Sequence, residues 1–256
     1  MRFNDKVAIV TGGANGLGKA FAIALAAGGC SVMIADIDAA GLEKTADQII
    51  TSHGRCLFQK TDMFNKNDIS AMVAYTIQEF KRIDILINCA GGSAGVANAP
   101  IEDIREEDWD KVVDLNFKGT FLCTQAVIPT MKQQGKGKIV NLSSITARLH
   151  SVLTPVQYTS SKGAISTFTR HIAGEVGPYG INVNAVAPGI ILTPRLEGMW
   201  NERRSEEERK AYIERIPLRR LGTVQDVVNS VLFLCSEESD YITGITLDLN
   251  GGLFSV

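Results

Sequence analysis

The stretch Lys6-Val-Ala-Ile-Val-Thr11, followed at once by Gly12-Gly-Ala-Asn-Gly-Leu-Gly18, decides the fold that we expect for this chain. The first segment is a short β-branched run typical of a strand, and the second is a glycine-rich turn. Lys19-Ala-Phe-Ala-Ile-Ala-Leu-Ala26 then has the composition of a helix. Glycines let the backbone approach a pyrophosphate, whose charge is met by free N–H groups at the helix N-terminus. An ordinary loop is the alternative for this turn taken alone.

A carboxylate at the end of the next strand supports the nucleotide-binding interpretation. Ser31-Val-Met-Ile-Ala35 is a second apolar run and Asp36 follows it, at the distance of about 20 residues from the glycines where a carboxylate can bind the adenosine ribose hydroxyls. No Arg or Lys lies within the glycine turn or directly after Asp36. A 2′-phosphate there would meet uncompensated negative charge, so the sequence predicts NAD in preference to NADP.

The alternation of strand and helix continues along the chain. Strands are expected at 55–59, 83–88, 138–142, 180–186 and 242–249, and helical stretches at 38–53, 66–81, 106–134, 156–176 and 224–236. Such alternation is the signature of a doubly wound parallel sheet. A chain of 256 residues with 45% hydrophobic content can bury one large core. We therefore expect a single Rossmann-like α/β domain over 1–256, with about seven strands.

Composition and charge argue against several kinds of partner. The formal net charge is −2 and the basic residues are spread along the chain, so nucleic acid is not expected to bind. No apolar run approaches the length that spans a bilayer, and the first six residues lack an apolar targeting core. The five cysteines are scattered without a CxxC, which favours reduced thiols over a zinc site or disulfides. We expect a cytoplasmic protein without membrane contact or metal.

Several polar and small residues follow the expected strands at one edge of the sheet. Asp62 lies just past the third strand, Ala90-Gly-Gly92 past the fourth, and Ser143-Ser144 past the fifth. Ligands of doubly wound sheets bind at this carboxyl edge. Asp62 has the alternative of capping the next turn. His150, in the loop 145–155, either lines the cleft or is simply exposed.

Tyr158-Thr-Ser-Ser-Lys162 places a phenol and an ammonium four residues apart in a segment with a helical pattern. Four residues make one helical turn, so the two side chains share a face. A tyrosine ordinarily has a pKa of about 10, and a nearby positive charge favours its phenolate. A surface Tyr and Lys on an ordinary helix is the alternative for an isolated pair. Asn116 is unfavourable inside a helix, so it either faces solvent or is held by a partner.

The segment 193–215 interrupts the alternation of strands and helices with a highly charged sequence. A solvated helical excursion is the default interpretation. Because the segment is inserted at the carboxyl edge after the sixth strand, it is also where a mobile substrate lid would lie. Neither this segment nor 149–156 contains a readable motif, so the sequence does not identify the substrate.

Taken together, these motifs resemble the short-chain dehydrogenase/reductase family from Lys6 to Gly252. The resemblance rests on Thr11-Gly-Gly-Ala-Asn-Gly-Leu-Gly18, Asn88-Cys-Ala-Gly91, Asn116, the serine pair, Tyr158-Thr-Ser-Ser-Lys162 and Pro188-Gly-Ile-Ile-Leu-Thr193. It implies that Tyr158 is the catalytic acid/base and that Ser144 orients the substrate oxygen. Lys162 would lower the pKa of the tyrosine and hold the nicotinamide ribose, and Asn116 would support a water-linked proton relay.

The resemblance also implies a set of cofactor contacts. They are Gly12, Asn15, Gly16, Leu17, Gly18, Asp36, Ile37, Asp62, Met63, Asn88, Ala90, Gly91, Tyr158, Lys162, Pro188, Gly189, Ile191 and Thr193. Asp62 would contact the adenine, and Ile191 and Thr193 the nicotinamide amide. Two features depart from the family pattern. Cys89 replaces a second asparagine, and the gap from Ser144 to Tyr158 is one residue longer than usual, which leaves Ser143 as the alternative serine.

The reaction that these residues predict is the interconversion of a secondary alcohol of the polyol, sugar, cyclic or hydroxy-acid type and its ketone. NAD+ takes the hydride, Tyr158 takes the proton as base, and a serine hydroxyl fixes the substrate oxygen. A 3-oxoacyl-carrier reductase is one alternative; Asp36 argues against it, whereas Arg195, Arg203 and Arg204 would suit a basic docking patch. A noncatalytic NAD-binding sensor is the other, but it has no need for Ser, Tyr, Lys and Asn together.

Two helical stretches, 107–134 and 156–176, carry more apolar residues than one sheet face would cover. These residues are Phe117, Phe121, Leu122, Val127, Ile128 and Met131 on the first stretch and Ile165, Phe168, Ile172 and Val176 on the second. Some should remain exposed on a monomer as a patch that marks an interface. The family resemblance implies that the helices pair about a two-fold axis and that a second contact near the C-terminal strand gives a homotetramer. A monomer with an ordinary core is the alternative.

Overall fold

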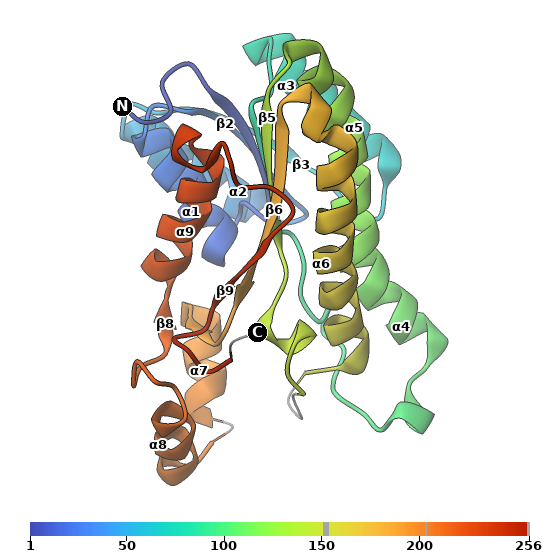
Figure 1. The fold of residues 1–256 in the computed structure, drawn as a ribbon, viewed down its shortest axis with the longest axis vertical. Coiled ribbons are helices and arrows are strands. Elements are labelled where there is room, and N and C mark those ends of the chain that lie inside the picture. Colours follow the sequence, from blue (N-terminus) through green and yellow to red (C-terminus); the bar gives the residue numbers. More distant parts are fainter. Residues whose placement is uncertain (151–153, 203, 255–256) are drawn as a thin grey trace.

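A seven-stranded parallel sheet forms the middle layer of the protein (Figure 1). The computed structural model describes residues 1–150, 154–202 and 204–254. The strands are β1 Val7–Thr11, β2 Ser31–Asp36, β3 Arg55–Lys60, β4 Ile85–Asn88, β5 Gly137–Leu142, β6 Ile181–Pro188 and β9 Thr246–Leu249. Their order is β3-β2-β1-β4-β5-β6-β9 and all of these neighbours pair in parallel. The predicted doubly wound fold is confirmed.

Helices cover both faces of the sheet, so its central strands β1, β4 and β5 are buried along their whole length. On one face lie α1 Gly16–Ala27, α2 Ala39–Thr51 and α9 Val224–Cys235; on the other lie α3 Lys66–Phe80, α5 Gly119–Gln134 and α6 Val156–Val176 (Figure 1). Each layer has its own hydrophobic core. Phe21, Leu25 and Val231 belong to the first, and Met72, Val127 and Ile139 to the second.

The strand order reverses between β1 and β4, and this reversal positions the ligand site. From β1 the chain proceeds to β2 and β3 on one side, and from β4 to β5 and β6 on the other. The connections that leave the ends of β1 and β4 therefore diverge, which opens a crevice at the carboxyl edge. Thr11 and Asn88, the last residues of these two strands, lie at that point.

The long helical stretch over 106–134 has one real interruption. It consists of α4 Glu106–Val113, a π-helical segment over Asp114–Lys118, and α5, which begins at Gly119. Pro129 does not interrupt the stretch, since it lies inside α5. Gln125, whose carbonyl lacks its helical donor at this proline, is itself exposed, so water can replace the missing bond.

The excursion over 193–215 forms two helices and has a small core of its own. The helices are α7 Pro194–Glu202 and α8 Glu206–Glu214, at the lower end of Figure 1. Trp200 packs with Ile216 and Leu221, and its ring meets that of Tyr212 edge-on at 5.4 Å between centroids. A short parallel pair, β7 Ile191–Leu192 with β8 Gly222–Thr223, joins the segment to the rest of the fold. No sequence pattern predicted this pair.

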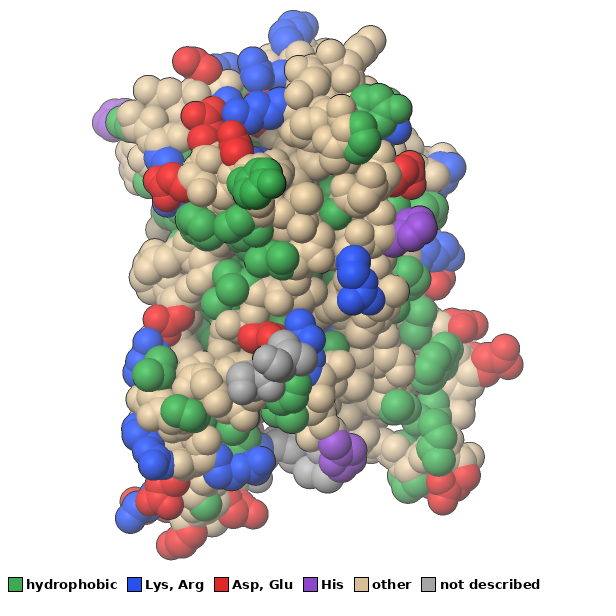
Figure 2. Space-filling view, in the orientation of Figure 1, with side chains coloured by type: hydrophobic (Ala, Val, Ile, Leu, Met, Phe, Trp, Pro, Cys, Tyr) green, Lys and Arg blue, Asp and Glu red, His purple; other side chains and the backbone are tan. Residues whose placement is uncertain are grey.

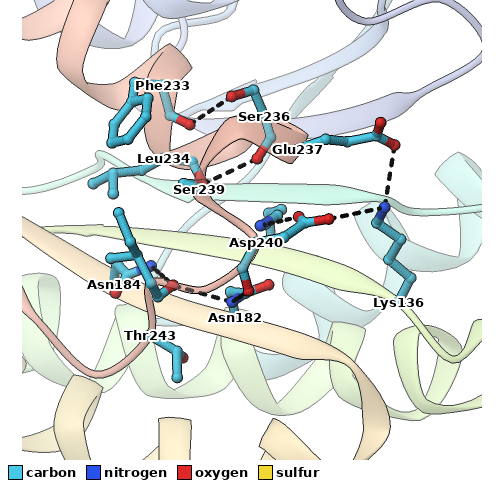
Figure 3. Close-up of polar contacts among 12 residues, drawn as sticks. Lys136, Asn182, Asn184, Phe233, Leu234, Ser236, Glu237, Ser239, Asp240 and Thr243 are labelled. Atoms are coloured by element: carbon cyan, nitrogen blue, oxygen red, sulfur yellow. Dashed lines mark hydrogen bonds and ion pairs between the residues drawn. The ribbon is translucent and has the colours of Figure 1, made fainter.

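The last strand is shorter than expected, because 242–245 form a turn that is bound to β6. Gly244 has φ +79° and its N–H donates to the Val183 carbonyl at 2.8 Å. Asn182 and Asn184 donate their side-chain amides to the Ile242 carbonyl at 3.0 and 2.9 Å (Figure 3). This polar network closes the amino edge of the sheet, opposite the ligand edge.

Within the described residues, no helix is long and apolar enough to cross a membrane. The cysteines are free thiols, of which Cys30, Cys123 and Cys235 are buried and Cys56 and Cys89 are partly buried. Burial raises the pKa of the Cys123 and Cys235 thiols to about 12. These two side chains are therefore neutral thiols at physiological pH.

Candidate active site

The glycine turn between β1 and α1 has the geometry of an anion cradle. Gly12 and Gly16 have φ values of +72° and +55°, a region that favours glycine. A side chain at Gly18 would collide with the Gly12 carbonyl, so the helix can pack this close to the turn only with glycine there. Helix α1 begins at Gly16, earlier than the expected Lys19, and Asn15 makes no side-chain cap to it among the described residues. The first N–H groups of α1 thus remain available for a phosphate.

Thr11 joins the two strand ends at the reversal point, a role that sequence reasoning missed. Its hydroxyl accepts the N–H groups of Cys89 and Ala90, both at 3.0 Å. These bonds fix the start of the loop after β4 against the glycine turn, where Gly12 and Ala90 nearly touch. A hydroxyl residue directly before the glycines was the available signal. Ala90 and the loop that continues into Gly91 therefore lie beside the turn, and their contact with a cofactor stays a prediction.

Asp36 lies beside the glycine turn as predicted. Its carboxylate accepts the N–H of Ala14 at 3.2 Å and that of Asp38 at 3.1 Å, which holds it beside the glycine turn. Ile37 is 59% exposed and is free to cover a flat ring. The register of β2 and β3 pairs Asp36 with Lys60, a cation that the linear sequence did not reveal as a neighbour. The side chain of Lys60 is exposed.

Asp62 and Met63 follow β3 at the same edge. Asp62 Oδ1 accepts the N–H of Phe64 at 2.9 Å, so the carboxylate does form the turn cap considered as its alternative role. Met63 is buried against α5, with its sulfur 3.8 Å from Cys123 Sγ. The side chain of Met63 faces the core, so only its backbone can meet a cofactor.

Asn88 is part of a buried polar chain that runs across the sheet. Its Nδ2 donates to Thr124 Oγ1 at 3.1 Å and to Asn141 Oδ1 at 2.8 Å, and Asn141 Nδ2 donates to Thr169 Oγ1 at 2.9 Å. The chain connects α5 to α6 through β4 and β5. Asn88 Oδ1 has no partner among the described residues. Because buried polar groups are nearly always paired, this oxygen is the point where Asn88 can still accept a bond.

Asn116 is held by the loop after β4 and does not face solvent, so the second of its two expected roles is the one observed. The side chain is 0% exposed, donates to the carbonyls of Gly92 and Val112 at 2.8 Å, and accepts the Gly92 N–H at 2.9 Å. It lies in the π-helical segment, whose wider turn displaces it from ordinary helical register. A side chain at Gly91 would collide with Asn116 Oδ1. Asn116 thus fixes the loop after β4 at the site.

The two serines after β5 point in different directions. The Ser144 hydroxyl lies near the Tyr158 phenol and acts to lower the pKa of that phenol. It also accepts Thr146 N–H and Oγ1–H at 3.2 and 3.1 Å, which caps the 3₁₀ turn Ile145–Ala147. The Ser143 hydroxyl instead donates to the Lys162 carbonyl at 2.8 Å. Despite the longer gap, Ser144 is the serine that reaches the phenol.

Lys162 lies beside Tyr158 inside the protein. The lysine is 4% exposed, its Nζ donates to the Leu142 carbonyl at 2.7 Å, and Nζ is 5.6 Å from the centroid of the Tyr158 ring. Burial lowers the pKa of Lys162 to about 8. Burial also raises the pKa of Tyr158, and the hydrogen bond from Ser144 opposes that rise. Within the chain alone, desolvation therefore outweighs the groups that favour the phenolate.

The segment after β6 supplies the remaining predicted contacts. The Gly189 N–H donates to the Leu249 carbonyl at 2.9 Å, which fixes the turn that follows Pro188. Ile191 is buried and Thr193 Oγ1 accepts the Leu196 N–H at 3.3 Å, capping α7. His150 is exposed, and the neighbouring loop residues 151–153 lie outside the described residues.

Comparisons with known proteins agree with this geometry. Residues 12–254 match the profile of a family described as enoyl-(acyl carrier protein) reductase. The chain is 40% identical to (2S)-[(R)-hydroxy(phenyl)methyl]succinyl-CoA dehydrogenase subunit BbsD of Thauera aromatica, over 98% of each chain. It is 36% identical to the 3-oxoacyl-[acyl-carrier-protein] reductase FabG of Thermotoga maritima, over 99% of each. The chain belongs to the short-chain dehydrogenase/reductase family.

Solved structures of relatives share the whole fold. Levodione reductase superposes with a TM-score of 0.91 at 32% identity and 98% coverage of both chains. A 7α-hydroxysteroid dehydrogenase in complex with NADH and 7-oxo glycochenodeoxycholic acid gives a TM-score of 0.90 at 34% identity, over 98% of this chain and 95% of that one. The chain is accordingly an oxidoreductase of a family that binds nicotinamide cofactors.

The buried lysine gives a first prediction, on stability. Lys162 has a pKa of about 8 when folded and an ordinary value of 10.5, so between these pH values the unfolded state holds a proton that the folded state has lost. Stability then rises with pH. The free energy of unfolding of wild type relative to Lys162→Met should increase by roughly 2–3 kcal/mol from pH 7.5 to 10. Denaturant titrations at several pH values measure it.

The matched control is Lys44→Met, which removes an exposed lysine from α2. Its difference from wild type should stay flat over the same pH range. A flat difference for Lys162→Met as well would show that the buried lysine titrates as it does in water.

Proposed function

We propose that the protein is an NAD-dependent oxidoreductase that interconverts a secondary alcohol of the polyol, sugar, cyclic or hydroxy-acid type and its ketone. The observation that carries the proposal is the convergence of Ser144, Tyr158 and Lys162 beside the crevice that the glycine turn opens. The cradle at Gly12–Gly18 and the carboxylate of Asp36 fit the two ends of a dinucleotide. We also propose that the protein acts in the cytoplasm on a small molecule, without nucleic acid, membrane or metal.

Tyr158 is the base in this reaction and Ser144 positions the substrate. The Ser144 hydroxyl, which lies near the phenol, can donate to the substrate oxygen and so hold that oxygen near the phenol. As the phenolate takes the hydroxyl proton, the carbinol carbon gives up its hydride, which a bound nicotinamide accepts. The positive charge of Lys162 favours the phenolate that burial disfavours, and the charge of an oxidised nicotinamide would add to this effect when bound. In the reverse direction the phenol is the acid.

Lys162 and Asn116 are placed to take part in transferring the proton from Tyr158 out of the site. Lys162 Nζ and Asn116 Oδ1 both approach Gly91, and the pKa of Lys162, about 8, suits proton exchange near neutral pH. A proton taken up by Tyr158 can therefore be passed on through Lys162. Asn116 keeps the loop after β4 in position for this transfer through its bonds to Gly92.

A reductase of carrier-bound 3-oxoacyl chains is the second candidate, because relatives with that name are similar over the full chain. Arg204, one of the arginines expected in its basic docking patch, is already engaged within the chain. Its guanidinium lies over the Trp200 ring at 4.6 Å and over the Tyr212 ring at 5.1 Å. Arg203 and the side chain of Arg195 lie outside the described residues. In Figure 2 basic and acidic side chains intermingle over α7 and α8, which does not favour an acidic carrier.

A screen for NAD+ reduction with secondary alcohols, polyols, sugars and hydroxy acids tests the proposal. The names of similar proteins range from a substituted succinyl-CoA to levodione and a 7α-hydroxysteroid, so thioesters and cyclic ketones belong in the panel. Turnover of any member excludes a noncatalytic sensor. Turnover only of 3-oxoacyl carriers with NADPH would favour the second candidate.

The catalytic prediction concerns the phenol. Tyr158→Phe removes only the hydroxyl that transfers the proton, so turnover should fall at least about a hundredfold, the lower end of acid–base contributions. Steady-state kinetics measure turnover, and fluorescence titration should show NADH affinity within about threefold of wild type. Near-normal turnover in this variant would contradict the mechanism.

The serine pair supplies the matched control. Ser144→Ala should be crippled, because its hydroxyl reaches the phenol. Ser143→Ala should retain most activity and lose stability instead, because it removes the buried hydrogen bonds of the Ser143 hydroxyl with the Lys162 carbonyl and the Ser166 hydroxyl, worth about 0.5–1.5 kcal/mol each. The opposite ranking of activities would transfer the role to Ser143.

The cofactor prediction rests on Asp36. A 2′-phosphate beside this carboxylate loses a hydrogen bond and meets repulsion, so kcat/KM should favour NAD+ over NADP+ by more than about tenfold, or 1.4 kcal/mol. Asp36→Ala should narrow that ratio, measured with one alcohol substrate. Lys60→Ala is the control, since it removes the adjacent cation and should widen the ratio. Equal efficiency with both cofactors in wild type would refute the preference.

We further propose that the protein is a homotetramer. Leu122, Val127, Met131, Ile165 and Val176 belong to the core. Phe117 in the π-helical segment, Phe121 and Ile128 in α5, and Phe168 and Ile172 in α6 remain partly exposed. Phe168 meets Phe117 and Phe121 edge-on at 5.8 and 6.3 Å. This aromatic ridge supports pairing of the two helices about a two-fold axis, which would brace the Tyr158 helix from behind.

Sedimentation equilibrium at micromolar concentration tests assembly. A species near four times the chain mass of 27.7 kDa is expected, and a single species at the chain mass would refute it. Phe121→Glu places a charge on the ridge and should yield smaller species. Phe58→Glu, at a similarly exposed phenylalanine on β3, is the control and should not.

A further inference from the structure

A cavity of about 380 Å³ lies on the side of α6 that faces β9, away from the phenol. Its lining includes Arg148, Ser166, Thr167, Arg170 and Thr246. β9 is the edge strand beyond β6, and Figure 1 shows the turn after β5 near the lower end of α6. Ser144, Tyr158 and Lys162 do not line the cavity, so it is distinct from the candidate active site.

The cavity exists because β9 is an edge strand that is covered differently on its two faces. Leu247 and Leu249 pack in the core layer of α9. Successive side chains on a strand alternate, so Thr246 and Asp248 face the side of α6. Gly163 on the cavity wall adds no side chain, and a Cβ there would meet no atom of the described residues within 4 Å. The space is therefore open for lack of side chains, and its walls are polar.

The charges on the walls do not balance. Arg148 Nε donates to Asp248 Oδ1 at 2.8 Å, which neutralises one guanidinium. Arg170 also lines the cavity, but it makes no hydrogen bond or ion pair to any described residue. The cavity thus carries one uncompensated positive charge beside the hydroxyls of Ser166, Thr167 and Thr246. A guanidinium with neighbouring hydroxyls is a suitable donor set for a carboxylate or phosphate group.

The walls are bonded to the catalytic groups. Ser166 Oγ lies 2.8 Å from Ser143 Oγ, and Ser143 in turn donates to the Lys162 carbonyl. On the other wall, the N–H groups of Ala147 and Arg148 donate to the carbonyls of Ser144 and Ile145 at 3.0 and 2.9 Å. An anion that bridges Arg148 and Arg170 would connect the turn that carries Ser144 to the helix that carries Tyr158.

We propose that this cavity is an effector site for a small oxyanion, a carboxylate or a phosphate group, whose binding alters the active site by fixing the Ser144 turn against α6. Only the effect on turnover rests on the proposed function; binding itself does not. The source of the anion, free phosphate or a carboxylate metabolite, is separated by using inorganic phosphate and succinate as parallel probes.

The binding test is isothermal titration calorimetry of the full chain with each probe, at saturating NAD+ so that the cofactor's pyrophosphate occupies the glycine turn. One anion per chain is expected, with affinity at least tenfold weaker in Arg170→Gln. Arg55→Gln is the matched control, because it neutralises an exposed arginine on β3, at the opposite edge of the sheet. Absence of binding, or equal affinity in wild type and Arg170→Gln, overturns the proposal. Loss of self-association in Arg170→Gln together with no anion binding would mean that a second copy fills the cavity, which also overturns it.

The coupling test compares amide hydrogen exchange over 143–148 and turnover, with and without the anion that binds. Slower exchange in wild type but not in Arg170→Gln is expected, together with at least a twofold change in kcat or KM. Binding that changes neither exchange nor turnover overturns the effector role. The exchange measurement needs no substrate, so it still tests the site if the alcohol screen finds no turnover and the proposed function fails.

Discussion

A reciprocal pair of hydrogen bonds between the end of β5 and α6 is the constraint on which the candidate site depends. Lys162 Nζ donates to the Leu142 carbonyl, and the Ser143 hydroxyl donates to the Lys162 carbonyl. Both side chains are 4% exposed, so the two bonds lie in a medium where they are stronger than in water. These two bonds fix the position of the end of β5 relative to α6. They therefore also position Ser144, which follows Ser143, relative to Tyr158, which lies one helical turn before Lys162. The serine–phenol contact follows from this register.

The same bonds explain why a lysine is tolerated in the interior. Its ammonium is satisfied in part by one carbonyl, while burial lowers its pKa to about 8. A fully solvated lysine would hold its proton too firmly to exchange it near neutral pH, and an apolar residue would remove the charge that stabilises a phenolate. The position thus sacrifices stability for a group that titrates in the working range. Tyr158 shows the complementary effect, since its own burial makes a neighbouring positive charge necessary.

Local sequence patterns predicted those elements whose conformation depends on neighbouring residues. They did not predict features whose geometry depends on contacts with residues far away in the sequence. The glycine turn, the apolar strands and Asp36 follow from spacing alone, and the structure places them as expected. The π-helical turn at Asn116 depends on Gly92, 24 residues away, and the role of Thr11 depends on Cys89 and Ala90. The choice between Ser143 and Ser144 depends on which serine meets the Lys162 carbonyl. Lys60 became a neighbour of Asp36 only through strand register.

The segment over α7 and α8 shows why this framework can serve different substrates. Trp200, Ile216 and Leu221 form a core separate from the two cores of the sheet, and Arg204 is stacked on its aromatic rings. Substitutions in this segment change its own surface and core. They do not disturb the hydrogen bonds that join the end of β5 to α6. Relatives with more than nine-tenths of their length in common with this chain carry names as different as levodione reductase and 7α-hydroxysteroid dehydrogenase. A segment with its own core can change its sequence while the register between β5 and α6 is kept, because the two depend on different sets of contacts.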